Sequence, residues 1–364
     1  MKALTIALLA VLAATAGCLD SGGDAPVQDT GLPYSAGSGT AADHGEPTRD
    51  DGDVDTQFDG LGWRATQTVT IRNDFGGAIW SDAQFANSNG DIHVMGWDEG
   101  DYQVVIEKSA RGMTPQEAED NLETIRIDHT DNVEGDRLRL ATVIDVEERP
   151  GDLPLLSFNS AGNAHITVYL PRAPGHNLQS ATSNGDLSAS GIRGPSVLLE
   201  SSNGDVHIHE TEAGLIAAVS SNGDIIVQAK AANVAAATSS GDVHVDHTPV
   251  ASGNLTIASS NGDVVVSVPG GDELAYELRA ATSNGAVTLD LEDVEEVGQP
   301  TESTRHVRTI DYDARPVQVQ VDLATSNGNV VAGHQAAQHD MGDDEEHDHE
   351  DHERVVQDVV KRFS

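Results

Sequence analysis

Hydrophobic and polar residues alternate along most of the chain, on both sides of a recurring four-residue motif. After each Ser-Asn-Gly-Asp copy, the third and fifth residues beyond the Asn are aliphatic or Ala, as at Val206 and Ile208. Before the motif, the second residue ahead of the Asn position is Ser or Thr in seven of eight copies. A period of two predicts β-strands with one buried face. We expect the inward hydroxyls to bond to the backbone or to neighbouring copies.

The motif recurs at a nearly constant distance. From Asn184 onward, successive copies are 19, 19, 18, 21, 23 and 43 residues apart, and the last interval contains the polar stretch 292–315. Asn-Gly provides the positive φ that a tight reversal or corner needs. The residues expected to form these turns are Asn89, Gly90, Asn184, Gly185, Asn203, Gly204, Asn222, Gly223, Asn261, Gly262, Asn284, Gly285, Asn327 and Gly328.

Two architectures fit this pattern. Stacked hairpins would form an antiparallel sheet, whereas a solenoid would make each Asn-Gly a corner with Asn stacked on Asn. The regular period, the small Ala and Ser interiors and an aromatic content of 4% favour the solenoid. The predicted fold class is therefore mainly β, a repeat β-solenoid resembling a parallel β-helix.

The region before the regular copies has a different composition. Most aromatic residues fall between residues 63 and 169. A short helix is predicted at 114–122, with Thr114 as N-cap and Pro115 at the first helical position. Strands are predicted at 102–107, 125–129 and 137–146. We expect residues 63–170 to form a bulkier N-terminal cap and residues 171–333 to form the regular repeats.

The repeat also carries a family resemblance. The run Ser88-Asn-Gly-Asp-Ile-His-Val-Met-Gly-Trp97 and the step Val168-Tyr-Leu-Pro171 precede the regular copies. From about residue 66 to 333 the chain resembles the putative-adhesin domain family, a group of bacterial and archaeal surface repeats of undefined activity. The resemblance implies a β-solenoid-like fold and supplies no catalytic residues.

The N-terminus predicts export. Met1-Lys2 is followed by an apolar run over 3–16 and then by Gly17-Cys18. This arrangement is typical of a lipoprotein signal peptide at 1–17, with Cys18 as the lipidated residue. Plain secretion and an uncleaved anchor are the alternatives. Residues 18–62 are acidic and poor in aliphatic residues, which predicts a disordered tether on the outer face of the cytoplasmic membrane.

Charge narrows the range of partners. With 20 Lys and Arg against 60 Asp and Glu, the formal net charge is −40, which excludes nucleic acid as a partner. Lys is scarce, and dispersed carboxylates of this kind are typical of proteins from salt-loving, haloarchaeal cells, where salt screens self-repulsion. The alternative is an ordinary acidic secreted protein.

Three groups of residues have metal-ligating chemistry. Residues 334–364 form an acidic His-rich tail whose His339, His347, His349 and His352 suit Zn or Cu, unless the tail is only a solvated end. The repeated Asp invites a calcium interpretation, but the period near 20 differs from that of calcium-binding nonapeptide repeats, so turn formation explains it better. Outward His207, His209 and His244 are expected on a solvated face, because His207 and His244 lie two repeats apart.

No enzyme motif is present: the sequence lacks a nucleophile elbow, a zincin helix and a phosphate loop. Asn254 begins a glycosylation sequon. The sequence therefore predicts a lipid-anchored, non-catalytic structural or interaction module that binds an unknown surface protein or glycan through a long acidic face. The alternative is a surface lipoprotein that captures divalent metal through its tail; an enzyme acting on envelope glycans is a third interpretation.

Overall fold

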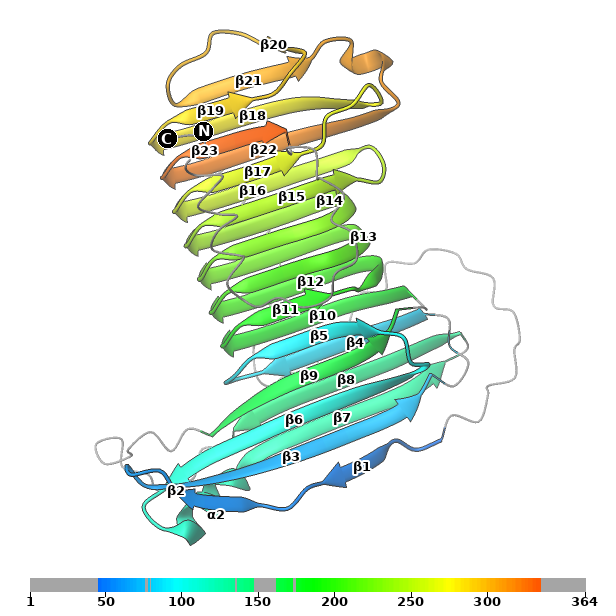
Figure 1. Ribbon diagram of the computed structural model, residues 1–364, viewed down its shortest axis with the longest axis vertical. Helices are drawn as coiled ribbons and strands as arrows, with labels where there is room; N and C mark the ends of the chain where they lie inside the picture. Colours follow the sequence, from blue (N-terminus) through cyan, green and yellow to red (C-terminus); the bar gives the residue numbers. More distant parts are fainter. Residues whose placement is uncertain are drawn as a thin grey trace, which may run out of the picture. The chain divides into compact units, whose positions relative to one another are not determined.

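The computed structural model describes residues 45–75, 78, 80–134, 136–146, 162–172 and 175–334. The predicted signal peptide, Cys18 and residues 335–364 of the predicted His-rich tail lie outside the described residues. The described part is almost entirely β, with one α-helix, and it confirms the solenoid (Figure 1). Successive copies of the motif pair in parallel and in register, as in Asn184 with Asn203 and Asn203 with Asn222. Hairpins would have paired antiparallel.

Each rung consists of a strand before the Asn-Gly corner and a strand after it. The strands before the corner are β4 (Trp80–Asn87), β10 (Gly175–Asn184), β12 (Arg193–Asn203), β16 (Gly253–Asn261), β18 (Leu274–Asn284) and β22 (Val317–Asn327). The strands after it are β5 (Ile92–Trp97), β11 (Leu187–Ser190), β15 (Val243–Pro249), β17 (Val264–Val268), β19 (Val287–Asp290) and β23 (Val330–His334). β13 (Val206–Asn222) and β14 (Ile225–Ser240) run through both positions. We call the stack of strands before the corner sheet I and the stack of strands after it sheet II.

The rungs are not stacked in chain order. β22 lies between β16 and β18 in sheet I, and β23 lies between β17 and β19 in sheet II. At the other end, β8 (Arg137–Val146) and β9 (Asn163–Pro171) pair on the outer side of β4 and β5, although β10 and β11 follow them in the chain. Each end of the stack therefore contains one transposed rung.

Inward residues of the two sheets form one continuous core of small side chains. Val206, Ile208, Ile225 and Val227 after the corner are fully buried, as the period-two pattern predicts. The Ser or Thr before the corner is also buried, and its hydroxyl donates to the corner glycine carbonyl of the adjacent rung. These bonds measure 2.8–3.0 Å and start from Thr182, Ser201, Ser220, Thr238, Ser259, Thr282 and Thr325. The hydroxyls are thus satisfied without a large core.

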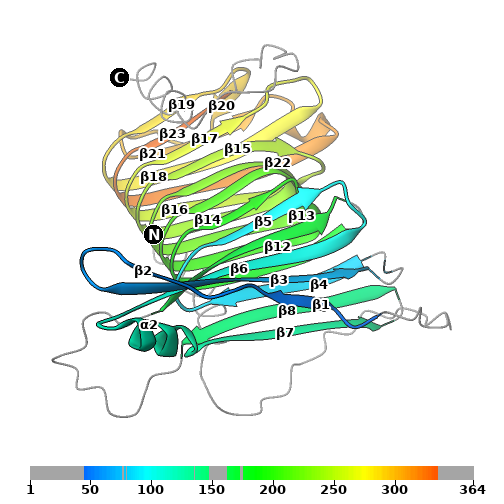
Figure 2. The same ribbon diagram turned by 60° about the horizontal axis from the view of Figure 1, so that its bottom comes forward.

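The cap is antiparallel where the array is parallel. β6 (Asp101–Gly112) pairs with both β3 (Trp63–Asp74) and β9, while β7 (Ile125–Glu134) pairs with β8. α2 (Pro115–Leu122) begins as predicted, because Thr114 Oγ1 accepts from the Glu117 N–H at 3.1 Å. Figure 2 shows this end of the molecule with β1, β2, β3 and α2.

Part of the predicted tether is ordered. We expected residues 18–62 to be disordered, but β1 (Thr48–Asp51) and β2 (Asp55–Phe58) both pair antiparallel with β3. Their side chains are mostly exposed, so the strands depend on backbone bonds to β3 and leave no hydrophobic alternation in the sequence. A polar edge strand of this kind cannot be predicted from the alternation of hydrophobic and polar residues.

The far end of the array is closed by irregular structure. β21 (Thr304–Thr309) pairs antiparallel with β18, and β20 (Val294–Glu296) pairs antiparallel with β21. The 3₁₀ helix η2 (Tyr312–Ala314) then leads into β22. The polar stretch 292–315 predicted from the sequence is therefore the segment that closes this end. A short, charged outer strand such as β20 discourages pairing with another sheet.

Candidate interaction surfaces

The corner is built around glycine. Gly204 has φ +152°, and a Cβ placed on it would lie 2.0 Å from the Gly185 carbonyl oxygen of the adjacent rung. The Gly204 N–H in turn donates to the Asn222 carbonyl at 3.0 Å. Glycine is required here both for its backbone conformation and for the close approach of two rungs.

The corner asparagines form a ladder. Asn203 Nδ2 donates to Asn184 Oδ1 at 3.1 Å, and Asn222 Nδ2 donates to Asn203 Oδ1 at 3.0 Å. The same bond joins Asn327 to Asn261 at 2.8 Å. The ladder is interrupted where the repeat has Ser240 in place of Asn. These amides hold consecutive corners together, so the Asn of the motif has a structural role.

The corner aspartates form a second ladder beside it. In each case a carboxylate Oδ1 accepts the backbone N–H of the residue at the same position in the next rung, at 2.7–2.9 Å. The accepting residues are Asp91, Asp186, Asp205, Asp224, Asp242 and Asp263. Asn329 continues the series by accepting from the Ala286 N–H at 3.1 Å. The repeated Asp is therefore used for rung-to-rung bonding rather than gathered around a cation. Neighbouring carboxylates repeat at the strand spacing of about 4.8 Å.

The outer face of sheet II has a connected row of polar side chains. His209 Nδ1 lies 3.1 Å from Gln228 Oε1, and Gln228 Nε2 donates to Asp246 Oδ2 at 3.2 Å. Asp246 also lies 3.4 Å from His244 Nε2. In the adjacent outward row, on the two rungs nearer the cap, His93 Nδ1 lies 2.8 Å from Ser188 Oγ, and Ser188 is in register with His207. This row provides many hydrogen-bonding groups on a flat strand surface.

Asp246 is the charged member of that row. Burial acts to raise the pKa of its carboxyl, but hydrogen bonds from His244, Gln228 and Ser267 and the nearby His244 charge outweigh burial and leave the pKa below its usual value. His207 and His244 do not meet, because Ile226 lies between them in register. The separation agrees with the repeat spacing.

The outer face of sheet I is almost uncharged in the middle of the array. In register with residues 196, 198 and 200, its outward positions from β10 to β16 carry one carboxylate, Glu200; the others are Asn177, Gln179, Ala181, Ser196, Leu198, Leu215, Ala217, Val219, Asn233, Ala235, Ala237, Asn254, Thr256 and Ala258. Glu212 lies outward further from the corner, in register with Arg193 and Lys230. The regularly repeated carboxylates that we expected on a long acidic face therefore lie in the corner ladder, and the middle of sheet I is not acidic. The two broad faces of the array carry very few carboxylates, and this distribution could not be read from net charge.

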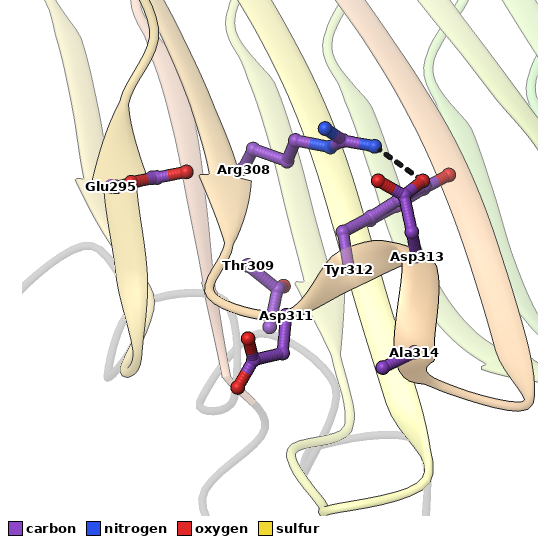
Figure 3. Close-up of a pocket in the computed structure, with 7 residues that line it drawn as sticks. All are labelled: Glu295, Arg308, Thr309, Asp311, Tyr312, Asp313 and Ala314. Atoms are coloured by element: carbon purple, nitrogen blue, oxygen red, sulfur yellow. Dashed lines mark hydrogen bonds and ion pairs between the residues drawn. The ribbon is translucent and has the colours of Figure 1, made fainter.

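A small hollow lies at the closed end, with a volume of about 260 Å³. Arg308 Nη2 donates to Asp313 Oδ1 at 2.7 Å, and its guanidinium carbon lies 4.5 Å from the centre of the Tyr312 ring (Figure 3). The basic group is thus already paired. Glu295 and Asp311 also line the hollow, which makes it a poor site for an anion.

Other candidate residues are separate from these features. Asn254 of the sequon is exposed at the start of β16. Across the described ranges, no three His, Cys, Asp or Glu side chains are grouped so that they could bind a metal ion. The tail histidines His339, His347, His349 and His352 fall outside those ranges. The helix in the described part is far too short and polar to span a membrane.

Solved structures with low overall similarity to this chain include three bacterial proteins. They are a "putative cell adhesion protein" from Clostridium sporogenes (10% identity, 74% of this chain and 100% of that one, TM-score 0.35), a "putative adhesin" from Bacteroides fragilis (13%, 72% and 96%, 0.32) and a "putative adhesin" from Parabacteroides distasonis (8%, 72% and 96%, 0.28). Among curated proteins, no match to this chain was found.

A family pattern covers most of the chain. The pattern described as Toastrack DUF4097 matches residues 82–331, which extend from β4 to β23. The match includes every Asn-Gly corner described above. The chain belongs to the Toastrack DUF4097 family.

Proposed function

We propose that the chain is a lipid-anchored cell-surface protein whose β-solenoid is a non-catalytic scaffold for binding a surface protein or glycan. The observation that carries this proposal is the use of the repeated polar residues. The Ser or Thr, Asn, Gly and Asp of the motif are engaged in bonds between rungs, as at Ser220, Asn222 and Asp224. A repeat whose polar groups hold the stack together is built for length and rigidity rather than for chemistry.

The broad faces favour a neutral, polar partner. Sheet II presents the His209, Gln228 and Asp246 row, and sheet I presents a surface with Glu200 as the carboxylate in its middle. Carbohydrates and uncharged protein surfaces can approach these faces without meeting the corner carboxylates. Nucleic acid would meet a net charge of −40.

The anchor is tested by localisation. Cells producing the full chain are fractionated beside cells producing Cys18→Ser, and the mass of the mature N-terminus is measured. We expect the parent in the membrane fraction with a diacylglyceryl group on Cys18, and the variant released from it. A parent that is recovered without lipid, or a variant that is retained equally, would contradict the anchor.

The binding face is tested with two matched changes. Ala235→Arg places a long cation on the sheet I face, and Gln228→Arg does so on the sheet II face. Retention of each full chain on washed cell envelopes is compared with that of the parent. We expect one substitution to lower retention at least tenfold and the other to leave it unchanged; equal retention of all three would contradict recognition through a broad face.

Metal capture by the C-terminal tail is a second proposal, supported by the density of imidazole and carboxylate groups there. Calorimetry with zinc and copper in molar salt compares the full chain with a variant carrying His347→Ala, His349→Ala and His352→Ala. Micromolar binding that the variant loses is the expected result. Equal, weak binding by both proteins would leave the tail without this role.

A further inference from the structure

Three strongly exposed hydrophobic residues gather at one end of the cap. Leu61, Met113 and Phe58 are 83%, 68% and 62% exposed, and the other large exposed hydrophobic residues of the described chain are at most 49% exposed. We call Phe58, Leu61 and Met113 the cap tip. Exposed apolar groups concentrated in this way mark an interaction site.

The cap tip is one surface because two turns meet there. Phe58 packs edge-to-face on Trp63, with ring centroids 5.6 Å apart, and Trp63 pairs with Gly112 at the end of β6. A Cβ on Gly62 would lie 3.0 Å from the Gly112 carbonyl oxygen. Leu61 and Met113 directly adjoin these two glycines in sequence, so the turns that carry them lie side by side.

The turn that carries Leu61 is held in one conformation. The Asp59 N–H donates to the Gly62 carbonyl at 3.0 Å, and Asp59 Oδ1 accepts the Leu61 N–H at 3.1 Å. Arg111 Nη2 lies 2.8 Å from Asp59 Oδ2, which ties the turn to β6. The exposed leucine is therefore presented by a fixed turn, which reduces the entropy lost on binding.

We propose that the cap tip inserts into the surface of the lipid bilayer, an inference that rests on the proposed membrane anchoring. The distance from the anchor permits it. Gly45 accepts a hydrogen bond from Asn73 at the end of β3 opposite the tip, and β3 has 12 residues, or about 40 Å. Cys18 and Gly45 are 27 residues apart, and a chain of that length spans at most about 90 Å. The anchor and the tip can therefore contact one membrane together.

The surrounding charge determines how the tip binds. Glu119, which accepts a hydrogen bond from Thr56 of β2, and Glu117 in α2 lie beside the tip and oppose an anionic membrane. At 1 M salt the screening length is about 3 Å, so these carboxylates have little effect beyond direct contact. Insertion therefore depends on apolar burial, and it is expected to persist in molar salt and on uncharged lipid.

The test uses the exported full chain with Cys18→Ser, so that no lipid is attached. Co-sedimentation with phosphatidylcholine vesicles is measured in 1 M salt for this chain, for the same chain with Leu61→Asp and Met113→Asp, and for a control with Ile310→Asp. Ile310 is 49% exposed at the far end of the array. We expect the tip variant to bind at least tenfold more weakly and the control to bind like the parent.

Several results would overturn the proposal. One is no binding of the parent to vesicles, and another is binding of the tip variant equal to that of the parent. A third is a tip variant that loses self-association but keeps vesicle binding, which would assign the tip to contact with a second copy of the chain. Circular dichroism of each variant separates misfolding from lost contact. These chains carry no lipid anchor, so the vesicle experiment and the Cys18 localisation experiment are independent. A negative result in one does not change the result expected in the other.

Discussion

The array and the cap build their interiors in different ways. The array core consists mainly of Val, Ile, Leu and Ala with buried Ser or Thr, and each rung repeats the bonds of its neighbour. The cap core contains Phe75, Phe85 and Tyr102, and its strands differ from one another in length and direction. Array stability thus comes from identical contacts between neighbours, whereas the cap depends on individual large side chains. Substitutions in the two regions should differ in size and in reach.

The largest expected effect is at an array corner. Gly204→Ala places a Cβ 2.0 Å from the Gly185 carbonyl oxygen, whereas Gly271, with φ +146°, has no atom within 4 Å of the corresponding position. We expect Gly204→Ala to lower the free energy of unfolding by roughly 3–5 kcal/mol and Gly271→Ala by about 1 kcal/mol. Denaturant titration in molar salt measures both. Equal losses would mean that backbone conformation, rather than rung contact, requires the glycine.

The next effect is a pH dependence that arises in the array, from its first strand beside the cap to its middle. Burial lowers the pKa of His176 beside the cap and of His247 in the array, although hydrogen bonds to the Pro171 and Ala231 carbonyls oppose the shift. Below pH 6.5, the ordinary pKa of histidine, these two imidazoles are protonated in the unfolded chain but stay neutral in the folded chain. Stability is therefore full above pH 6.5 and falls as the pH drops, by up to about 1.4 kcal/mol per pH unit for each histidine.

Unfolding free energies between pH 7.5 and 5 measure this slope. We expect His247→Gln to reduce it by about one proton relative to the parent, because the buried imidazole of His247 is the group whose pKa is lowered by folding. A slope unaffected by His247→Gln would show that this histidine becomes protonated without unfolding.

A smaller effect distinguishes rung bonding from core volume. Ser220→Ala removes the 2.9 Å hydrogen bond to the Gly204 carbonyl, which should cost about 1–2 kcal/mol. Ser220→Thr keeps the hydroxyl, and Thr182 and Thr238 fill the same position in other rungs, so we expect little change. Thermal unfolding of the three proteins gives the comparison. If the Thr variant is as unstable as the Ala variant, packing rather than hydrogen bonding governs the site.

The smallest effect concerns the acidic ladder. Replacing Asp205, Asp224 and Asp242 by Asn keeps an acceptor for each N–H, as Asn329 does naturally, and removes three neighbouring charges. We expect the triple variant to be more stable than the parent by about 1 kcal/mol at low salt and equal to it at 1 M salt. Melting curves across a salt series test this expectation. A variant that is less stable at every salt concentration would show that the carboxylate hydrogen bonds stabilise the fold by more than the charge repulsion destabilises it.

The sequence predicted the local geometry of the rungs better than their order. Period two identified the buried Val206 and Ile208, and the regular spacing, small interiors and scarcity of aromatics favoured the parallel stacking that the structure has. The transposed rung at β22 and β23 was not predictable, since all copies offer the same bonds to any neighbour. Thr325 donates to the Gly262 carbonyl just as a hydroxyl of the next copy in the chain would. Identical repeats specify a contact without specifying which copy makes it.

The candidate surfaces show the same limit. His207 and His244 were placed two rungs apart from spacing alone, and the register agrees. The cap tip was not found, because Leu61 and Met113 are 52 residues apart and neither belongs to a periodic segment. The low charge of the broad faces also depends on which alternate residues point outward, whereas net charge is summed over the whole chain.

The transposed rung has a consequence for synthesis. When β18 and β19 leave the ribosome, the open edge beside them belongs to β16 and β17, and the strands that occupy that edge in the finished protein have not yet been made. The rung formed by β18 and β19 can pair with this edge in the same register, so it can dock there before β22 and β23 are made. Residues 291–316 must then be long enough for β22 and β23 to displace it. Assembly of this end is therefore a competition between two equivalent strand pairs, and we expect it to be the slowest step of folding.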